Sequence, residues 1–237
     1  MPFPDLPERV REVRGRIDAA VQRGGQGQQV KVVAVTKTHG PDAAAAAWDA
    51  GLRDVGENRV QEALVKMDAV MVPLRWHLIG HLQRNKVKHA GRFALFHALD
   101  SARLADALQE VGGRREEEGE GEGEGGNPVD VLLQVNVVGE QSKGGYPLSA
   151  VAAEAERLRR MNGLRVRGVM AMAPLDADDR TLRTVFAGAR RARQMLRDAG
   201  HDAPELSMGM SNDFEIAVEE GATLVRLGTI LFGARSA

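Results

Sequence analysis

The sequence predicts an α/β protein that folds as a single (β/α)8 barrel of the TIM-barrel class, and three observations lead to this fold. Short β-branched runs alternate along the chain with amphipathic helical patterns, which is typical of parallel βαβ units. Eight such repeats follow one another within about 200 residues, which suits a closed barrel of near-minimal length. An open doubly wound sheet is the main alternative, but the GxGxxG turn that usually follows its first strand is absent after Val35.

The chain begins with a helical pattern, which together with its lead-in segment spans residues 1–29. Apolar side chains recur at spacings of three and four, at Leu6, Val10, Val13, Ile17 and Val21. This spacing places them on one face of a helix. We therefore expect an extra N-terminal helix that belongs to a single domain over residues 1–237.

Runs of β-branched and apolar residues predict eight strands. They lie at residues 32–36, 53–56, 76–79, 95–99, 131–135, 166–170, 206–208 and 224–227. This composition is typical of parallel strands, because both faces of a parallel sheet are covered. Most of the segments between them carry apolar residues at helical spacing. The first of these helices is expected to begin at Pro41 and to end before Gly51.

The segment EEEGEGEGEGG, residues 116–126, interrupts the repeat. It is acidic, glycine-rich and of low complexity, so it cannot bury enough apolar surface to pack against the barrel. We expect a flexible surface loop before the fifth strand. A functional acidic tether is the alternative.

Composition and charge exclude several classes of protein. The chain has 32 Lys and Arg against 33 Asp and Glu, so its formal net charge of -1 gives no general attraction to nucleic acid or to anionic membranes. The absence of cysteine excludes disulfides, thiolate metal sites and a cysteine nucleophile. No run approaches the ~18 apolar residues of a membrane span, and the N-terminus lacks the apolar run of a signal peptide. We therefore expect a cytoplasmic protein, and we expect a monomer because no long apolar stripe remains unassigned.

Lys37 follows the first predicted strand, whose other residues are apolar or small. In a TIM barrel the C-terminal ends of the strands carry the catalytic groups. An apolar wall disfavours the ammonium form and lowers the pKa of a lysine, so that the neutral amine can form a Schiff base with a carbonyl. The alternative is a lysine that extends to the surface at a strand end.

Two further segments predict a phosphate site. SMGMSND (207–213) and VRLGT (225–229) follow the seventh and eighth strands, whose loops usually bind phosphate in this barrel class. Gly209 allows close backbone approach, Ser211 is placed to cap the next helix, and Gly228 with Thr229 supplies N–H groups and a hydroxyl. Ordinary strand–turn junctions are the alternative. Together with Lys37, the segments pair an amine with a phosphate cradle, as pyridoxal 5′-phosphate (PLP) requires.

Arg226 lies in the middle of the eighth strand, where a charge is costly unless it is paired. A guanidinium can only donate hydrogen bonds, so beside the ring nitrogen of PLP it would keep that nitrogen unprotonated and the ring a weak electron sink. This arrangement favours holding the cofactor over carbanion chemistry. The alternative is a salt bridge inside the barrel.

The remaining polar segments are less specific. Asn58, in GEN (56–58) after the second strand, faces the cofactor ring or hydrogen-bonds a neighbouring strand end. The alternative is that it opens the following helix with Glu57. His77 and His81 are four residues apart, but Gly80 ends a strand between them. They would therefore not share a helix face, and we predict no zinc site.

Seven segments closely resemble the PLP homeostasis protein family, a family of PLP-binding proteins. They are VAVTKTHG, VGENRVQE, WHLIGHLQRNK, QVNVVGEQSKGGYP, RGVMAMAP, LSMGMSNDFEIAVEEGAT and VRLGTILFG. The match extends from Val30 to Arg235 in the family's order and spacing, and the main departure is the insert at 116–126. The resemblance implies a barrel like the N-terminal domain of bacterial alanine racemase.

The same resemblance implies the site and the function. PLP would be bound through Lys37, with Asn58 along the ring and Arg226 near the ring nitrogen. Ser211, Gly228 and Thr229 would hold the phosphate, with Met210 nearby. The family has no well-established catalytic activity, so no catalytic or metal-binding residue is expected. The implied role is to buffer PLP and to supply it to apo-enzymes through transient contacts, with other vitamin B6 vitamers as further ligands.

Two other functions remain as alternatives. A PLP-dependent amino-acid racemase needs a second acid/base opposite the lysine. The only tyrosine, Tyr146, falls in a loop, and nothing singles out His39 or His81 for that role. A pure interaction protein would bind no cofactor and would leave Lys37 and the two phosphate loops without a shared purpose.

Overall fold

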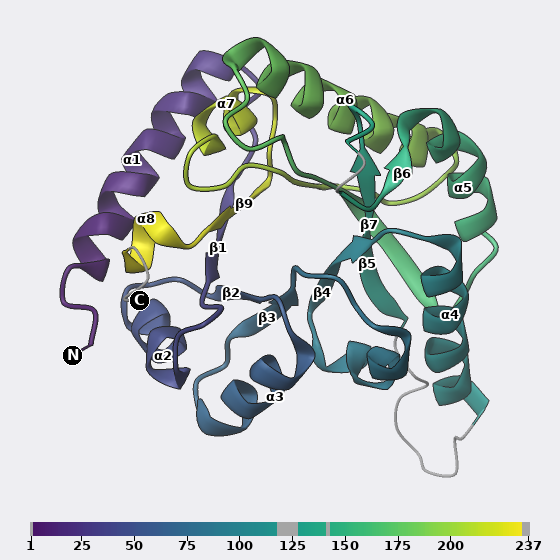
Figure 1. The fold of residues 1–237 in the computed structure, drawn as a ribbon, viewed down its shortest axis with the longest axis horizontal. Coiled ribbons are helices and arrows are strands. Elements are labelled where there is room, and N and C mark those ends of the chain that lie inside the picture. Colours follow the sequence, from purple (N-terminus) through teal and green to yellow (C-terminus); the bar gives the residue numbers. More distant parts are fainter. Residues whose placement is uncertain (1, 118–127, 141–142, 234–237) are drawn as a thin grey trace.

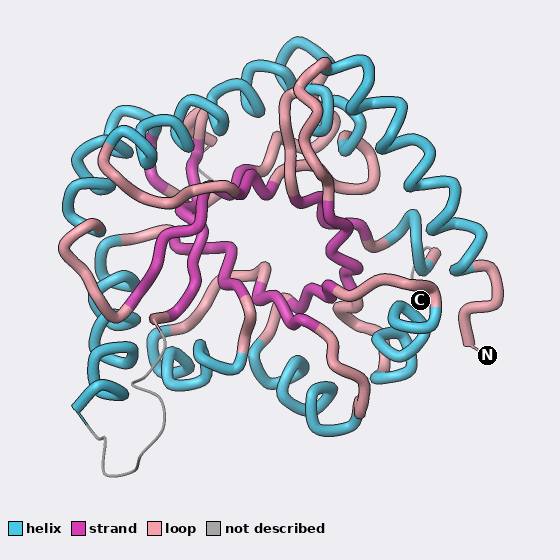
Figure 2. Tube along the Cα trace, turned by 180° about the vertical axis from the view of Figure 1, so that it is seen from behind, coloured by secondary structure: helices cyan, strands magenta, loops and turns pink. Residues whose placement is uncertain are grey.

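The computed structural model describes residues 2–117, 128–140 and 143–233, which form one closed parallel β-barrel surrounded by helices. Figure 2 shows the ring of strands at the centre of the molecule with the helices outside it. The predicted (β/α)8 barrel is therefore confirmed. Within these residues, no helix combines the length and the apolar character needed to cross a membrane.

The barrel strands lie close to the predicted positions. They are β1 (Lys31–Val35), β2 (Asp54–Glu57), β3 (Arg75–Leu78), β4 (Leu95–Leu99), β5 (Val129–Asn136), β7 (Leu164–Ala171), β8 (Glu205–Ser207) and β9 (Leu224–Leu227). Each pairs in parallel with its neighbours, and β4 pairs with β5 to complete the ring. A short further strand, β6 (Tyr146–Pro147), pairs with β5 only and lies outside the ring.

Helices cover the outside of the barrel (Figure 1). They are α1 (Leu6–Gly24), α2 (Pro41–Asp49), α3 (Val60–Ala69), η1 (Arg84–Arg92), α4 (Ala102–Glu117), η2 (Leu148–Ala150), α5 (Val151–Leu158), α6 (Asp179–Asp198), α7 (Phe214–Glu219) and α8 (Thr229–Phe232), with η marking 3-10 helices. Apolar faces of these helices pack on the strands, so the main hydrophobic core is the layer between the two.

Helix α1 is the extra helix expected at the N-terminus, and it packs along α7 and α8 (Figure 1). Leu6, Val10, Val13 and Ile17 are buried on its inner face. Arg16 and Glu215 form an ion pair of 2.6 Å that ties the helix to α7. The beginning and the end of the described chain therefore pack together.

The acidic insert differs from the expected loop at its start. Helix α4 continues to Glu117, so residues 116 and 117 are helical rather than part of a loop. Glutamate and arginine are strong helix formers, which explains why the helix extends into the acidic run. The rest of the insert, 118–126, lies outside the described residues.

Candidate functional site

A cavity of about 950 Å³ opens at the C-terminal ends of the barrel strands. All the site residues predicted from the sequence line it, namely Lys37, Asn58, Met210, Ser211, Arg226, Gly228 and Thr229. They come from the segments after β1, β2 and β8 and from β9 with its following turn. This end of the barrel is where proteins of this fold class carry their ligand sites.

Lys37 stands in a tight turn directly after β1, and it is half-buried against the cavity. The turn is closed by a hydrogen bond of 3.1 Å from the N–H of His39 to the carbonyl of Thr36. Thr38, the residue after Lys37, has a positive φ of 69°. A non-glycine residue rarely adopts this conformation, so the surrounding structure must hold the turn in place.

A buried ion pair beneath this turn provides that support. Lys66 Nζ of helix α3 donates to Glu57 Oε1 at 2.6 Å and to the carbonyl oxygen of Thr36 at 2.8 Å. The hydroxyl of Thr36 donates to the same Glu57 oxygen. All three side chains are buried. From the sequence alone, Glu57 was a candidate for opening the next helix, and Lys66 carried no signal. In the structure, both side chains fix the backbone that precedes Lys37.

The two loops proposed for phosphate lie side by side. The N–H of Arg226 donates to the carbonyl of Gly209 at 3.0 Å, and the N–H of Ile230 donates to Ser211 Oγ at 3.4 Å. Gly209 has a φ of 92°, and a Cβ there would lie 2.7 Å from the Cβ of Ala217, so this position requires glycine. Gly228 precedes α8, whose first N–H groups have no acceptor within the helix.

One expectation for this region is wrong. Ser211 does not cap helix α7, because the helix begins later and its N-cap residue is Asp213. The carboxylate of Asp213 instead accepts a hydrogen bond from the N–H of Met210. Ser211 is consequently half-buried on the cavity wall and contacts the loop after β9.

Arg226 is buried at the floor of the cavity. Its guanidinium donates to Ser207 Oγ at 2.5 Å and to the carbonyl of Ala171 at 3.1 Å. These partners are neutral, so the salt bridge considered as an alternative is not how the described residues hold this side chain. Burial lowers the pKa of Arg226 to about 10, against the opposing influence of Asp213. The guanidinium therefore stays charged at neutral pH.

Asn58 follows β2 directly and lines the cavity. Helix α3 begins at Val60 with Arg59 as its N-cap residue, so Asn58 does not open that helix. A Cβ atom at position 80 would lie 2.4 Å from the carbonyl oxygen of Asn58, so only glycine fits beside Asn58 at Gly80. Asn58 is thereby held between the ends of β2 and β3.

The three candidates for a second acid/base lie in different places, and His81 is the one of them that lines the cavity. His81 Nδ1 lies 2.9 Å from Asp100 Oδ2. His39 packs instead between the rings of Phe3 and Phe232, with ring centroids 5.5 Å and 5.4 Å away. The hydroxyl of Tyr146, the one tyrosine in the sequence, donates to Glu154 at 2.8 Å and is absent from the cavity lining.

The chain matches a known family over nearly its whole length. The family model described as the N-terminal domain of alanine racemase matches residues 11–236. A curated pyridoxal phosphate homeostasis protein of Aquifex aeolicus is 40% identical over 233 residues, which cover 96% of this chain and 97% of that protein. A protein of the same name from Pseudomonas aeruginosa is 40% identical over 233 residues, or 97% of this chain and 96% of that one.

Solved structures agree with the barrel. PipY of Synechococcus elongatus, solved with PLP bound, superposes with a TM-score of 0.82 at 34% identity, covering 96% of this chain and 100% of that one. Alanine racemase from Corynebacterium glutamicum has a TM-score of 0.70 at 16% identity, over 93% of this chain and 60% of that one. The second likeness concerns the fold alone.

Proposed function

This chain belongs to the family of pyridoxal phosphate homeostasis proteins, and we propose that it binds PLP in the cavity and holds it for use elsewhere. The donor set of the cavity fits this cofactor. It combines primary amines, side-chain amides, a charged guanidinium and a loop pair with hydroxyl and N–H donors. An aldehyde, a pyridine ring and a phosphate require these groups. The geometry that carries the proposal is that Lys37 and both loops face one cavity.

Each residue has a distinct role in this proposal. Lys37 would hold the cofactor covalently as a Schiff base, and Asn58 would lie along its ring. Ser211, Gly228 and Thr229 would donate to the phosphate, and Met210 would border it. When bound, PLP supplies a reactive aldehyde and an electron-withdrawing ring. Arg226 can only donate to the ring nitrogen, so this nitrogen would stay unprotonated and the ring would withdraw electrons only weakly.

We propose that the protein is a carrier rather than an enzyme, and that it passes PLP to apo-enzymes. The curated relatives are named for homeostasis rather than for a reaction. The phenol of Tyr146 is held by Glu154, and burial followed by this hydrogen bond raises the pKa of Tyr146 far above its ordinary value. Tyr146 is thus unsuited to act as the second base of a racemase.

PLP binding is tested by the visible absorption of the purified protein, before and after borohydride, with the reduced adduct located by peptide mass. We expect a coloured protein with the adduct on Lys37, and no adduct in Lys37→Ala. Lys31→Ala is the matched control, because Lys31 lies at the opposite end of the same strand and pairs with Glu205 at 2.8 Å. A colourless protein that takes up no added PLP would refute the proposal.

The carrier role needs its own measurements. Free amino acids incubated with the PLP-loaded protein in deuterated water should keep their α-protons. Steady loss of α-protons would make the protein a PLP enzyme, with His81 as the first residue to substitute. Transfer is tested by reactivation of an apo-enzyme, which should proceed faster than PLP leaves the protein into a trap. Equal rates would mean simple release without transfer.

A further inference from the structure

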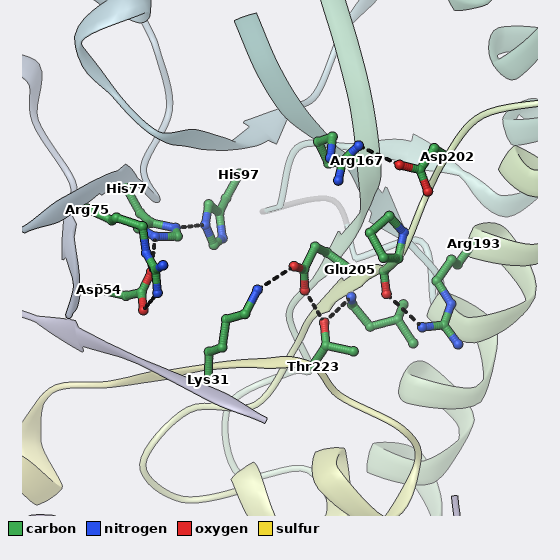
Figure 3. A network of polar contacts seen from close by, with 12 residues as sticks. Lys31, Asp54, Arg75, His77, His97, Arg167, Arg193, Asp202, Glu205 and Thr223 are labelled. Carbon is green, nitrogen blue, oxygen red and sulfur yellow. Dashed lines mark hydrogen bonds and ion pairs between the residues drawn. The ribbon is translucent and has the colours of Figure 1, made fainter. Parts of the chain in front are cut away.

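A continuous line of hydrogen bonds crosses the interior of the barrel and ends at Arg226. Asp54 Oδ1 lies 2.9 Å from His77 Nε2, and His77 Nδ1 lies 2.9 Å from His97 Nε2. His97 Nδ1 lies 2.9 Å from Ser207 Oγ, which accepts from Arg226. Figure 3 shows the first part of this line, in which the two imidazoles follow one another from Asp54. The five side chains come from five different strands, β2, β3, β4, β8 and β9.

The carboxylate end of the line sets its direction. A carboxylate only accepts, so His77 donates to Asp54 from Nε2. When His77 carries this one hydrogen, its Nδ1 accepts from His97 Nε2. His97 Nδ1 then accepts from the hydroxyl of Ser207, whose oxygen accepts from Arg226. Every hydrogen bond therefore points from the guanidinium toward the carboxylate.

Burial makes this single arrangement strongly preferred. All five side chains are buried, and an unpaired polar group there would lose its hydration without compensation. Burial lowers the pKa of His97 well below its ordinary value, so this imidazole is neutral. A neutral imidazole has one donor and one acceptor nitrogen, as the line requires.

The far end of the line is anchored at the N-terminal rim of the barrel. Arg75 donates two hydrogen bonds to Asp54, from Nε to Oδ1 at 2.7 Å and from Nη2 to Oδ2 at 2.6 Å. The side chain of Arg75 is 56% exposed, whereas Asp54 is buried. Burial opposes ionisation of Asp54, but the hydrogen bonds from His77 and Arg75 outweigh it and hold its pKa below the usual range. The carboxylate is thus ionised and can accept from both neighbours.

We propose that Asp54, His77 and His97 are positioning residues for Arg226, because they fix the tautomers that turn the hydroxyl hydrogen of Ser207 toward His97 and its lone pairs toward the guanidinium. The acceptors Ser207 Oγ and the carbonyl of Ala171 hold the two Nη atoms. Further N–H groups of the guanidinium remain for a ligand in the cavity. The carboxylate of Asp54 at one end of the barrel in this way sets the orientation of the Arg226 guanidinium at the other end. The expected effect on PLP affinity rests on the proposed function. The expected tautomers of His77 and His97 do not depend on it.

Asp54→Leu is the variant that tests this idea, because leucine has the branched shape of the carboxylate but no acceptor. His77 Nε2 then loses the oxygen to which it donates, so neither imidazole is held to a hydrogen on Nε2. Once His97 carries its hydrogen on Nδ1, the hydroxyl hydrogen of Ser207 no longer has this nitrogen as its acceptor. The lone pairs of Ser207 are then no longer directed at Arg226. Asp130→Asn is the matched control, because Asp130 pairs with Arg165 at the same rim, outside the line.

The first measurement is the imidazole 15N–1H correlation spectrum of the protein without cofactor. We expect His77 and His97 to carry hydrogen on Nε2 in the unaltered protein and in Asp130→Asn, and to lose this preference in Asp54→Leu. A hydrogen on Nδ1 of either residue in the unaltered protein overturns the proposal, whether or not the variant folds. This outcome is independent of PLP.

The second measurement is the affinity for PLP, titrated by absorbance. Asp54→Leu and Ser207→Ala should each weaken binding by about tenfold or more, the loss expected for one hydrogen bond to a charged group. Asp130→Asn should bind as the unaltered protein does. Equal affinities in all four proteins, with the expected tautomers, would overturn the coupling to Arg226. Failure of the unaltered protein to bind PLP would instead refute the proposed function.

Discussion

Lys66→Ala should destabilise the barrel far more than a surface substitution, because it leaves a carboxylate without its partner in the core. The side chains of Lys66 and Glu57 are 6% and 0% exposed, and their charged atoms lie 2.6 Å apart. Glu57 Oε2 already has no hydrogen-bond partner among the described residues. The variant would therefore leave the hydroxyl of Thr36 as the remaining donor to this carboxylate.

The magnitude follows from the burial of the pair. Removing one member of a buried ion pair costs about 3–5 kcal/mol, a large part of the ~5–15 kcal/mol that holds a typical protein folded. Urea unfolding of the cofactor-free protein should show this loss as a midpoint lowered by about 1–2 M, at slopes of roughly 2–3 kcal/mol per molar urea. The carbonyl of Thr36 also loses one of its two donors, Lys66 but not the N–H of His39, so the turn that carries Lys37 should loosen and PLP retention should fall.

Two controls distinguish this explanation from a general effect of shortening a lysine. Arg92→Ala removes an exposed ion pair with Asp68, whose atoms lie 3.2 Å apart, and should cost less than about 1 kcal/mol. The double variant Glu57→Leu, Lys66→Met removes both charges and should recover most of the stability. A Lys66→Ala midpoint within error of Arg92→Ala would refute the reasoning, because the carboxylate would then tolerate burial alone.

Two further predictions concern pH and phosphate. Burial lowers the pKa of His97 well below the ~6.5 of an unfolded histidine. Below pH ~6.5 the unfolded state then binds more protons, so the free energy of unfolding should fall by up to about 1.4 kcal/mol per pH unit as pH decreases. His97→Gln should flatten this slope in urea titrations between neutral and mildly acidic pH, and an unchanged slope would assign it to another group. Ser211→Ala should weaken PLP binding by about 1.5–3 kcal/mol in an absorbance titration, whereas an unchanged affinity would remove Ser211 from the phosphate site.

The fold and most of the site followed from local sequence patterns. Strands and helices of a parallel barrel each have their own hydrophobic period, and that period is visible in one sequence. The C-terminal ends of the strands converge in this fold, so residues that follow different strands share one cavity. Lys37 and Thr229 could be placed together for this reason, although they lie near opposite ends of the chain.

The supporting residues could not be predicted in the same way. Lys66 occupies an ordinary position in an amphipathic helix, and its burial depends on how α3 packs against β1 and β2. Ser211 looked like a helix cap because the sequence does not show at which residue α7 begins. The acidic run likewise looked like a loop from residue 116, whereas its first residues extend α4.

The sequence by itself determined the type of fold and the position of Lys37 and the two loops at one end of the barrel, because these depend on periodicity and on residues next to strand ends. Only the tertiary structure decided which buried polar groups meet. His97 and Ser207 contact one another across 110 positions of sequence because both side chains lie inside the closed ring, where β5 and β7 separate β4 from β8. A hydrogen bond inside a barrel depends on which strands are opposite and on the height of each side chain. Closure of the ring sets both, and no local pattern records them.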